Sequence, residues 1–308
     1  MGLALGSGAA RGWVHVGIIR ALAEAGIQAD VVTGTSAGAV VGAFYAADKL
    51  DRLEEFAGEL NSIRSTARYM DFSLSQPALI GGRSFVQFLE DYLGVRRFEE
   101  LKKPFGVCAT NLVDMNEVHI YEGALIPAIR ASVAVPGFLA PLSAGEDRQL
   151  ADGGMLNPIP VNLARKLGAE IVIGVDVNSH PQLKRFDSIT TILNRSMEVM
   201  MNRIRINNRH FFPADLWLEP DLSDYGFFDL HRHQTAIDVG RRLVQERIDD
   251  IRRFRDHHFI ASEKRVRIPD MLSRAREYFS FGANEDYSKL DAELENDSQS
   301  PADENEVD

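Results

Sequence analysis

The chain has 308 residues, of which 45% are hydrophobic, and it carries a formal net charge of −11. This apolar content is sufficient for a sizeable buried core. Ten acidic residues and one lysine lie in Asn284–Asp308, so that segment accounts for a charge of −9. The remaining residues carry about −2, and without a strongly basic region the sequence predicts no nucleic-acid partner.

The segment after residue 283 also contains few large apolar side chains. We therefore expect one folded domain over residues 1–283 and a disordered acidic tail over residues 284–308. No secretory signal is recognisable at the start, and no apolar run reaches the roughly 18 residues of a membrane span. These features favour a cytoplasmic protein with at most peripheral contact at the inner face of a membrane. The oligomeric state does not follow from the sequence.

The first part of the chain predicts a strand, a helix and a second strand in close succession. Its expected elements are a strand over Gly2–Leu5, a glycine-rich loop over Gly6–Gly12, a helix over Trp13–Ala25, a strand from Val31 and a helix over Ala39–Ala47. Two strands joined by a helix form a βαβ unit, which implies parallel pairing and a right-handed crossover.

The later part continues the alternation. A mostly helical pattern runs over Asp51–Leu93, with a loop at Phe72–Arg83. Later elements are strands over Phe105–Ala109, Glu117–Tyr121 and Glu170–Val177 and helices over Ile189–Asn208 and Thr235–Arg253. This alternation predicts an α/β fold whose mainly parallel sheet is covered on both faces. The single cysteine, Cys108, is expected to be a small buried residue of a strand.

The pentapeptide Gly34-Thr35-Ser36-Ala37-Gly38 lies between the second predicted strand and the following helix. A G-x-S-x-G sequence in a strand-turn-helix context is typical of a nucleophile elbow, with Gly34 and Gly38 allowing the tight turn. Ser36 would then lie at a helix N-terminus, where the helix dipole and free N–H groups stabilise developing negative charge. The alternative interpretation is a tight connection without a chemical role.

The loop Gly6–Gly12 has the spacing G-x-G-x-x-x-G. One interpretation is an oxyanion hole formed by its backbone N–H groups. Another is a dinucleotide-binding loop with Asp30 on the ribose, although the spacing is one residue longer than the usual fingerprint. Arg11 would bind a phosphate or carboxylate of a substrate, or would hold the loop through a salt bridge.

A third motif, Leu150-Ala151-Asp152-Gly153-Gly154, places an aspartate at the end of a short strand. Asp152 is a candidate general base, and the alternative is an Asx-turn or a helix cap. A free aspartate has a pKa of about 3.9 against about 6.5 for histidine, which makes it the weaker base by about 3.5 kcal/mol. A serine-aspartate pair therefore requires that Asp152 is partly desolvated and reaches Ser36 directly.

A histidine triad would avoid that requirement. The histidines are His15, His119, His180, His210, His231, His233, His257 and His258. The late ones lie in polar stretches without a distinctive motif, and Ser36 is carried by the second strand, unlike the nucleophile of α/β-hydrolases, which lies well into the chain. A triad is therefore disfavoured, and His15 is expected to pack or cap on its helix.

These three motifs, in their order and contexts, resemble the patatin-like phospholipases, and the chain is most similar to the bacterial branch related to neuropathy target esterase. The segments Ile129–Gly137, Asn157–Val161 and Leu167–Val177 extend the resemblance, which covers about residues 2–178. One departure is Asn111, where relatives often carry an aspartate. No motif after about Asn178 could be matched.

The resemblance implies a three-layer α/β/α fold and a serine-aspartate dyad that hydrolyses lipid acyl esters without a metal or cofactor. It implies that Ser36 is the nucleophile and that Asp152 activates it. It further implies an oxyanion hole made by Gly6, Ser7, Gly8 and Ala9, and it places Arg11 where the family has a basic residue. A non-catalytic regulatory protein with the same fold remains the main alternative, and a dinucleotide-binding protein is the other.

Two segments are candidates for contact with lipid. Phe72–Phe88 combines aromatic and aliphatic residues with a glycine-containing loop, which suits a lid or an acyl-chain wall. Ile192–Phe212 mixes methionine, isoleucine and arginine at near-helical spacing, which suits an anionic membrane surface. The alternative, which the sequence favours, is that this helix packs its apolar stripe on the sheet.

Overall fold

A computed structural model describes residues 1–60, 62, 65, 82–145, 147–180, 189–226 and 229–264 of the chain. The expected acidic tail and residues 72–81 of the expected lid lie outside these ranges. The division into a domain over residues 1–283 and a tail therefore stays a prediction.

Within the described residues, the strands form one sheet. They are β1 (Gly2–Leu5), β2 (Val31–Thr35), β3 (Phe105–Asn111), β4 (Asn116–Ile120), β5 (Leu142–Ser143), β6 (Gln149–Asp152), β7 (Val172–Val175) and β8 (Leu216–Leu218). The pairs β1-β2, β2-β3, β1-β7 and β7-β8 are parallel, whereas β4 and β6 pair antiparallel with β3, and β5 pairs antiparallel with β6. The predicted mainly parallel sheet is confirmed.

Helices surround this sheet. The longer ones are α1 (Trp13–Glu24), α2 (Ala37–Ala46), α3 (Leu50–Glu59), α5 (Arg83–Phe88), α6 (Leu125–Ser132), α7 (Val161–Lys166), α8 (Ile189–Phe211) and α9 (His233–Lys264). Short helical turns are η1 (Ala9–Gly12), η2 (Leu89–Leu93), η3 (Phe98–Glu100), η4 (Gly153–Met155) and η5 (Leu230–Arg232).

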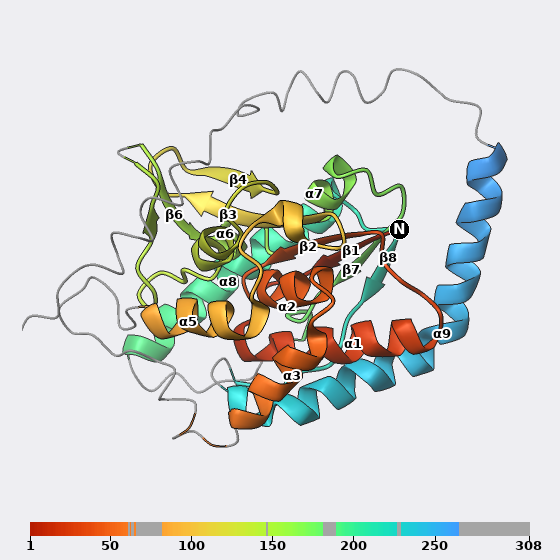
Figure 1. Ribbon diagram of the computed structural model, residues 1–308, viewed down its shortest axis with the longest axis horizontal. Coiled ribbons are helices and arrows are strands. Elements are labelled where there is room, and N and C mark those ends of the chain that lie inside the picture. The colour runs from red at the N-terminus through yellow and green to blue at the C-terminus, as the bar shows by residue number, and fades with distance from the viewer. Residues whose placement is uncertain are drawn as a thin grey trace, which may run out of the picture.

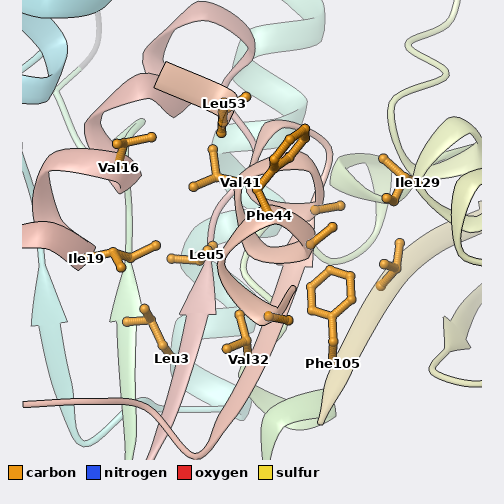
Figure 2. Close-up of a cluster of buried hydrophobic side chains, with 14 of the residues drawn as sticks. Leu3, Leu5, Val16, Ile19, Val32, Val41, Phe44, Leu53, Phe105 and Ile129 are labelled. Carbon is orange, nitrogen blue, oxygen red and sulfur yellow. The ribbon is translucent and has the colours of Figure 1, made fainter. Parts of the chain in front are cut away.

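The side chains of β1 alternate between two apolar layers. Leu3 and Leu5 belong to a large core with α1, α2, α3 and α9, while Ala4 belongs to a smaller core with α7 and the chain after α8. Figure 2 shows Leu3 and Leu5 below α1 and α2, close to Val16, Ile19 and Phe44 of those helices. Because successive residues of a strand point to opposite faces, this alternation makes a three-layer α/β/α arrangement.

Helices α1 and α9 run alongside each other below the sheet in Figure 1 and pack closely. A Cβ atom at Gly17 of α1 would overlap the carbonyl oxygen of Ile237, and one at Gly240 of α9 would overlap that of Val14. The two glycines therefore let the helix backbones approach each other. Through this contact the chain returns to pack on its own N-terminal helix.

Some sequence-based boundaries change. β7 is shorter than the predicted strand over Glu170–Val177, and α9 extends well past the predicted helix over Thr235–Arg253. The end of the expected lid belongs to the core, since Phe88 is 6% exposed and its ring centroid lies 4.0 Å from that of Phe56. Phe88 is therefore part of the core, and the interpretation of Phe72–Phe88 as a lid or an acyl-chain wall stays a prediction.

Candidate active site

Ser36 lies between β2 and α2 with φ 56° and ψ −120°. A positive φ is costly for a residue with a side chain and persists only where the surroundings enforce it. A Cβ atom at Gly34 would overlap the carbonyl oxygen of Gly38, and one at Gly38 would overlap that of Leu5. Both positions therefore require glycine, and the turn has the close packing and the strained serine expected of a nucleophile elbow.

The backbone of the elbow is held by a serine of α6. The N–H of Ser36 donates to Oγ of Ser132 at 2.8 Å, and Ser132 Oγ donates to the carbonyl oxygen of Cys108 at 2.6 Å. Ser132 lies within the segment Ile129–Gly137 that carries part of the resemblance, but no sequence signal indicated this role. It fixes the Ser36 backbone to β3.

Asp152 is brought beside Ser36 by the way that β3 is paired. β4 occupies one edge of β3 over residues 107–111, so β2 and β6 share the other edge. Thr35 of β2 is paired with Cys108, and Asp152 of β6 is paired with the next residue, Ala109. The two strands therefore run toward each other along one edge of β3, and the serine and the aspartate lie where they meet.

The side chain of Ser36 lies beside the carboxylate of Asp152 and lowers its pKa, against the effect of burial. Both side chains are buried, with residue exposures of 6% and 4%. Asp152 Oδ1 also accepts a hydrogen bond from the N–H of Gly154 at 2.7 Å, so it caps η4 as well. Asp152 thus caps η4 and contacts Ser36 at the same time. Its role as a helix cap does not exclude a role as a general base.

Burial raises the pKa of Asp152 to about 6, while the hydrogen bonds from Ser36 and Gly154 oppose the shift. Removing the carboxylate from water disfavours its charged form and makes it a stronger base. The value lies close to the ordinary pKa of histidine, about 6.5. The desolvation that a serine-aspartate pair requires is present.

In the part of the chain that the structure describes, the side chains and N–H groups that lower the pKa of Asp152 belong to Ser36 and Gly154, and no histidine is among them. His15 is fully buried on α1, and its Nε2 lies 2.8 Å from the carbonyl oxygen of Gly6. Burial lowers the pKa of His15 to about 4, so the ring is neutral at pH 7 and Nε2 carries the proton that Gly6 accepts. His15 thus packs under the glycine loop, as the sequence predicts.

The backbone N–H groups of the glycine loop divide into two sets. The N–H of Gly6 donates to Val175 O at 3.1 Å, and that of Ser7 donates to Pro158 O at 2.8 Å. In the part of the chain that the structure describes, Gly8 and Ala9 have no such partner. Ala9 has φ 48°, an unusual conformation for alanine that re-aims the backbone at this point. Gly8 and Ala9 therefore hold the N–H groups that can bind an anion.

The loop packs against the elbow. A Cβ atom at Gly12 would overlap the side chain of Ala37, the residue after Ser36. A Cβ atom at Gly154 would lie 2.9 Å from Asp152 Oδ1 and 3.1 Å from Ser7 Oγ. The three sequence motifs thus converge on one place, which is the arrangement expected of the oxyanion-hole interpretation of the loop.

Arg11 is directed into the protein. Its Nη1 donates to Asn178 Oδ1 at 2.6 Å, and Nε and Nη2 donate to the carbonyl oxygen of Tyr225 at 3.3 and 3.2 Å. Burial lowers the pKa of its guanidinium. Asn178 in turn donates from Nδ2 to Ser7 O at 2.6 Å. These contacts match the alternative in which Arg11 holds the loop, with neutral acceptors in place of a salt bridge.

One cluster has the residue types of a metal site. Donor atoms of Cys108, Glu117 and His119 lie within 4.8 Å of one another. However, Glu117 Oε1 already accepts hydrogen bonds from His119 and from the side-chain amides of Asn157 and Asn162. Burial also raises the pKa of the Cys108 thiol, which disfavours the thiolate that a metal needs. The cluster is accounted for as a hydrogen-bonded network.

Comparison with known proteins identifies a family for the part of the chain that carries the three motifs. The sequence model of a family described as patatin-like phospholipase matches residues 3–165. An uncharacterized NTE family protein of Mycobacterium tuberculosis is 39% identical over 176 residues, which is 57% of this chain and 48% of the relative. Patatin-like phospholipase domain-containing protein 7 of Rattus norvegicus is 35% identical over 187 residues, which is 58% of this chain and 14% of the relative.

The matched region therefore spans about half of the length of the mycobacterial relative. Among solved structures, VipD from Legionella pneumophila is similar with a TM-score of 0.46 and 13% identity, over 80% of this chain and 66% of that one. Among the described helices, none combines the length and apolar composition of a transmembrane span. The cytoplasmic location stays a prediction.

Proposed function

Since the chain belongs to the patatin-like phospholipase family, we propose that it is a serine hydrolase that cleaves fatty-acyl esters of phospholipids, lysophospholipids or related lipids. The observation that carries the proposal is that the buried side chain of Ser36 lies beside the buried carboxylate of Asp152 and influences its pKa. Ser36 acts as nucleophile and Asp152 as its general base, without a metal or cofactor.

In the first half of the reaction, Ser36 Oγ attacks the ester carbonyl carbon and its proton passes to Asp152. The carbonyl oxygen becomes an oxyanion, which the N–H groups of Gly8 and Ala9 stabilise. Collapse of the tetrahedral intermediate breaks the bond to the leaving alkoxide, which takes the proton back from Asp152. The products are an alcohol or lysolipid and an acyl-enzyme.

In the second half, Asp152 takes a proton from a water molecule that attacks the acyl carbon. The same N–H groups stabilise the second oxyanion. Its collapse releases the fatty acid and returns the proton to Ser36 Oγ. Gly6 and Ser7 contribute indirectly in this proposal, because their N–H groups bond to the protein and fix the loop.

The nucleophile is tested with a fluorophosphonate probe, which phosphonylates an activated serine. Wild-type protein should be labelled and Ser36→Ala should not. Ser196→Ala is a matched control, since Ser196 is exposed on α8 and its hydroxyl bonds to Ile192 O of the same helix. Labelling that survives Ser36→Ala would show that the nucleophile is another residue.

Hydrolysis of short p-nitrophenyl esters separates an enzyme from a regulatory protein that retains the fold. Turnover by the wild type that is lost in both Ser36→Ala and Asp152→Asn supports the enzyme. If the correctly folded wild type has no turnover on short or long acyl esters, the regulatory alternative is favoured. Binding of a nicotinamide or flavin nucleotide in a thermal-shift assay would instead favour a dinucleotide-binding protein.

A further inference from the structure

Helix α8 presents an apolar stripe to solvent, which we call the exposed stripe. Its exposed apolar members are Ile192 (50%), Val199 (59%), Met200 (60%), Ile206 (44%) and Phe211 (70%). Exposed Ser196, Arg203, Asn207 and His210 lie among them. Their spacing of three or four residues places them along one side of the helix. Exposed apolar residues that gather on one helix face mark an interaction surface.

The opposite side of α8 is already packed on the protein. A Cβ atom at Gly154 would lie 3.3 Å from Met201 Cε. Asn208 Nδ2 donates to Leu156 O at 2.7 Å, and Arg205 pairs with the buried Asp176. The alternative that the sequence favours, in which the apolar stripe packs on the protein, is therefore wrong for Met200, whereas Met201 does pack. The exposed stripe is left for another partner.

The charge of α8 indicates what that partner is. Arg203 lies near the middle of the exposed stripe and His210 near its end. Glu198 is the only acidic residue in the sequence of α8; it lies off the stripe and pairs with Arg195 at 2.9 Å. An amphipathic helix binds at the surface of an anionic bilayer when its exposed face combines apolar residues with basic side chains and carries no acidic ones.

A second copy of the chain fits the stripe less well. If two α8 helices packed antiparallel about a two-fold axis, residues near the middle of each stripe would face their own copies. Arg203 would then face the partner's Arg203 in an apolar contact, and the repulsion between like charges opposes such a dimer. Anionic lipid headgroups accept the same side chain favourably.

We propose that the exposed stripe of α8 docks the protein on an anionic lipid surface and brings the dyad to its substrate. Met200 and Met201 are adjacent, and the first faces solvent while the second lies against Gly154, whose N–H donates to Asp152 Oδ1. The exposed stripe therefore lies on the same helix that contacts the proposed active site from its packed side. The choice of lipid as the occupant rests in part on the proposed function.

The test is flotation of the full chain with vesicles of phosphatidylcholine alone and of phosphatidylcholine mixed with phosphatidylglycerol. The Ser36→Ala protein is used, so that hydrolysis does not alter the vesicles. Val199→Asp with Met200→Glu should lower binding to the mixed vesicles about tenfold or more. Arg203→Gln should lower it about fivefold, and only where phosphatidylglycerol is present.

A matched control carries Val113→Asp and Met115→Glu, which change exposed apolar residues (51% and 78%) between β3 and β4. This variant should bind vesicles as the parent does. The inference is overturned if the parent does not float, if the α8 variants float equally well, or if light scattering shows a dimer that Met200→Glu dissociates.

A second assay separates docking through α8 from the proposed hydrolase function. It measures hydrolysis of a soluble p-nitrophenyl ester by proteins that carry the same α8 substitutions and retain Ser36. Retained hydrolysis with lost flotation supports docking through α8. Because flotation is measured on a protein that lacks Ser36, docking can be confirmed even if the wild type has no turnover and the proposed function fails. Loss of both flotation and hydrolysis would show that the substitutions damage the fold and would contradict a role confined to docking.

Discussion

Ser36 and Asp152 meet because β2 and β6 run toward each other along one edge of β3 and end at adjacent residues of it, Cys108 and Ala109. The side chain of the first residue then lies beside the carboxylate of the second and lowers its pKa. β6, which pairs antiparallel with β3 in an otherwise mainly parallel sheet, thus supplies Asp152, the second residue of the proposed dyad.

The first prediction concerns the pH dependence of activity. Burial raises the pKa of Asp152 to about 6, and the base must be deprotonated to accept the proton of Ser36. We expect kcat/KM for a soluble ester to fall as the pH falls through about 6 and to be level above about 7. Asp152→Asn should lower kcat about 10²-fold to 10⁴-fold. A profile without a transition between pH 5 and 7 would contradict Asp152 as the base.

The same shift predicts an effect on stability. A carboxyl whose pKa is higher in the folded state than the ordinary 3.8 penalises folding as the pH rises from about 4 to about 6. Below about pH 4 this carboxyl does not lower the free energy of unfolding, and above about pH 6 it lowers it by about 3 kcal/mol. Asp152→Asn should therefore be more stable than wild type in urea at pH 8 and about equally stable at pH 4. Equal stability at pH 8 would show that the carboxylate is not desolvated.

His15 is predicted to position the glycine loop. His15→Phe removes the donor to Gly6 O and should lower the free energy of unfolding by about 1–3 kcal/mol at pH 8 and lower kcat for a soluble ester. His15→Gln, which retains a donor, should restore part of both. Equal kcat in wild type and His15→Phe would contradict a role in the loop.

The buried His15 also predicts acid sensitivity. The folded pKa of about 4 lies below the ordinary 6.5, so the unfolded chain binds a proton first. The corresponding stability is present above about pH 6.5 and is lost as the pH falls toward 4. His15→Gln should lose less stability than wild type between pH 7 and pH 5 in urea titrations. An identical loss would show that His15 is not the responsible group.

Ser132 is predicted to support the elbow. Ser132→Ala leaves the buried N–H of Ser36 without its acceptor and should lower the free energy of unfolding by about 1–3 kcal/mol. The rate of fluorophosphonate labelling should fall as well, because the strained backbone of Ser36 loses its tie to β3. Ser143→Ala, which changes a partly exposed serine bonded to Gln149, is the control. Unchanged labelling and stability would contradict this role.

Asp176 is predicted to hold α8 on the sheet. Its carboxylate is 1% exposed and pairs with Arg205 and Arg209 of α8. Removing one partner of a buried ion pair costs about 3–5 kcal/mol, so Asp176→Ala should shift the urea midpoint strongly. Asp250→Ala, at an exposed pair within α9, should leave the urea midpoint nearly unchanged. Similar effects of the two changes would contradict the assignment.

The fold was predictable where residues repeat with a clear period or carry a turn signal. β1, the start of α1 and the elbow all lie where the pattern of glycines and apolar residues predicts. The two-residue β5 and the three-residue β8 were not predicted, since so few residues show no alternation. Helices α6 and α7 were missed for a similar reason, as they span 8 and 6 residues.

Sequence alone was enough to predict the turn at Ser36, the glycine loop and Asp152 as candidates, because strained turns restrict which residue types fit and so leave a local signature. How these parts combine follows from the folded chain: Ser36 lies beside Asp152, two of the four loop N–H groups bond to the protein, and Arg11 points inward. The tertiary structure also showed which side of α8 faces solvent. Such contacts depend on strand pairing and burial between distant segments, and no local pattern encodes them.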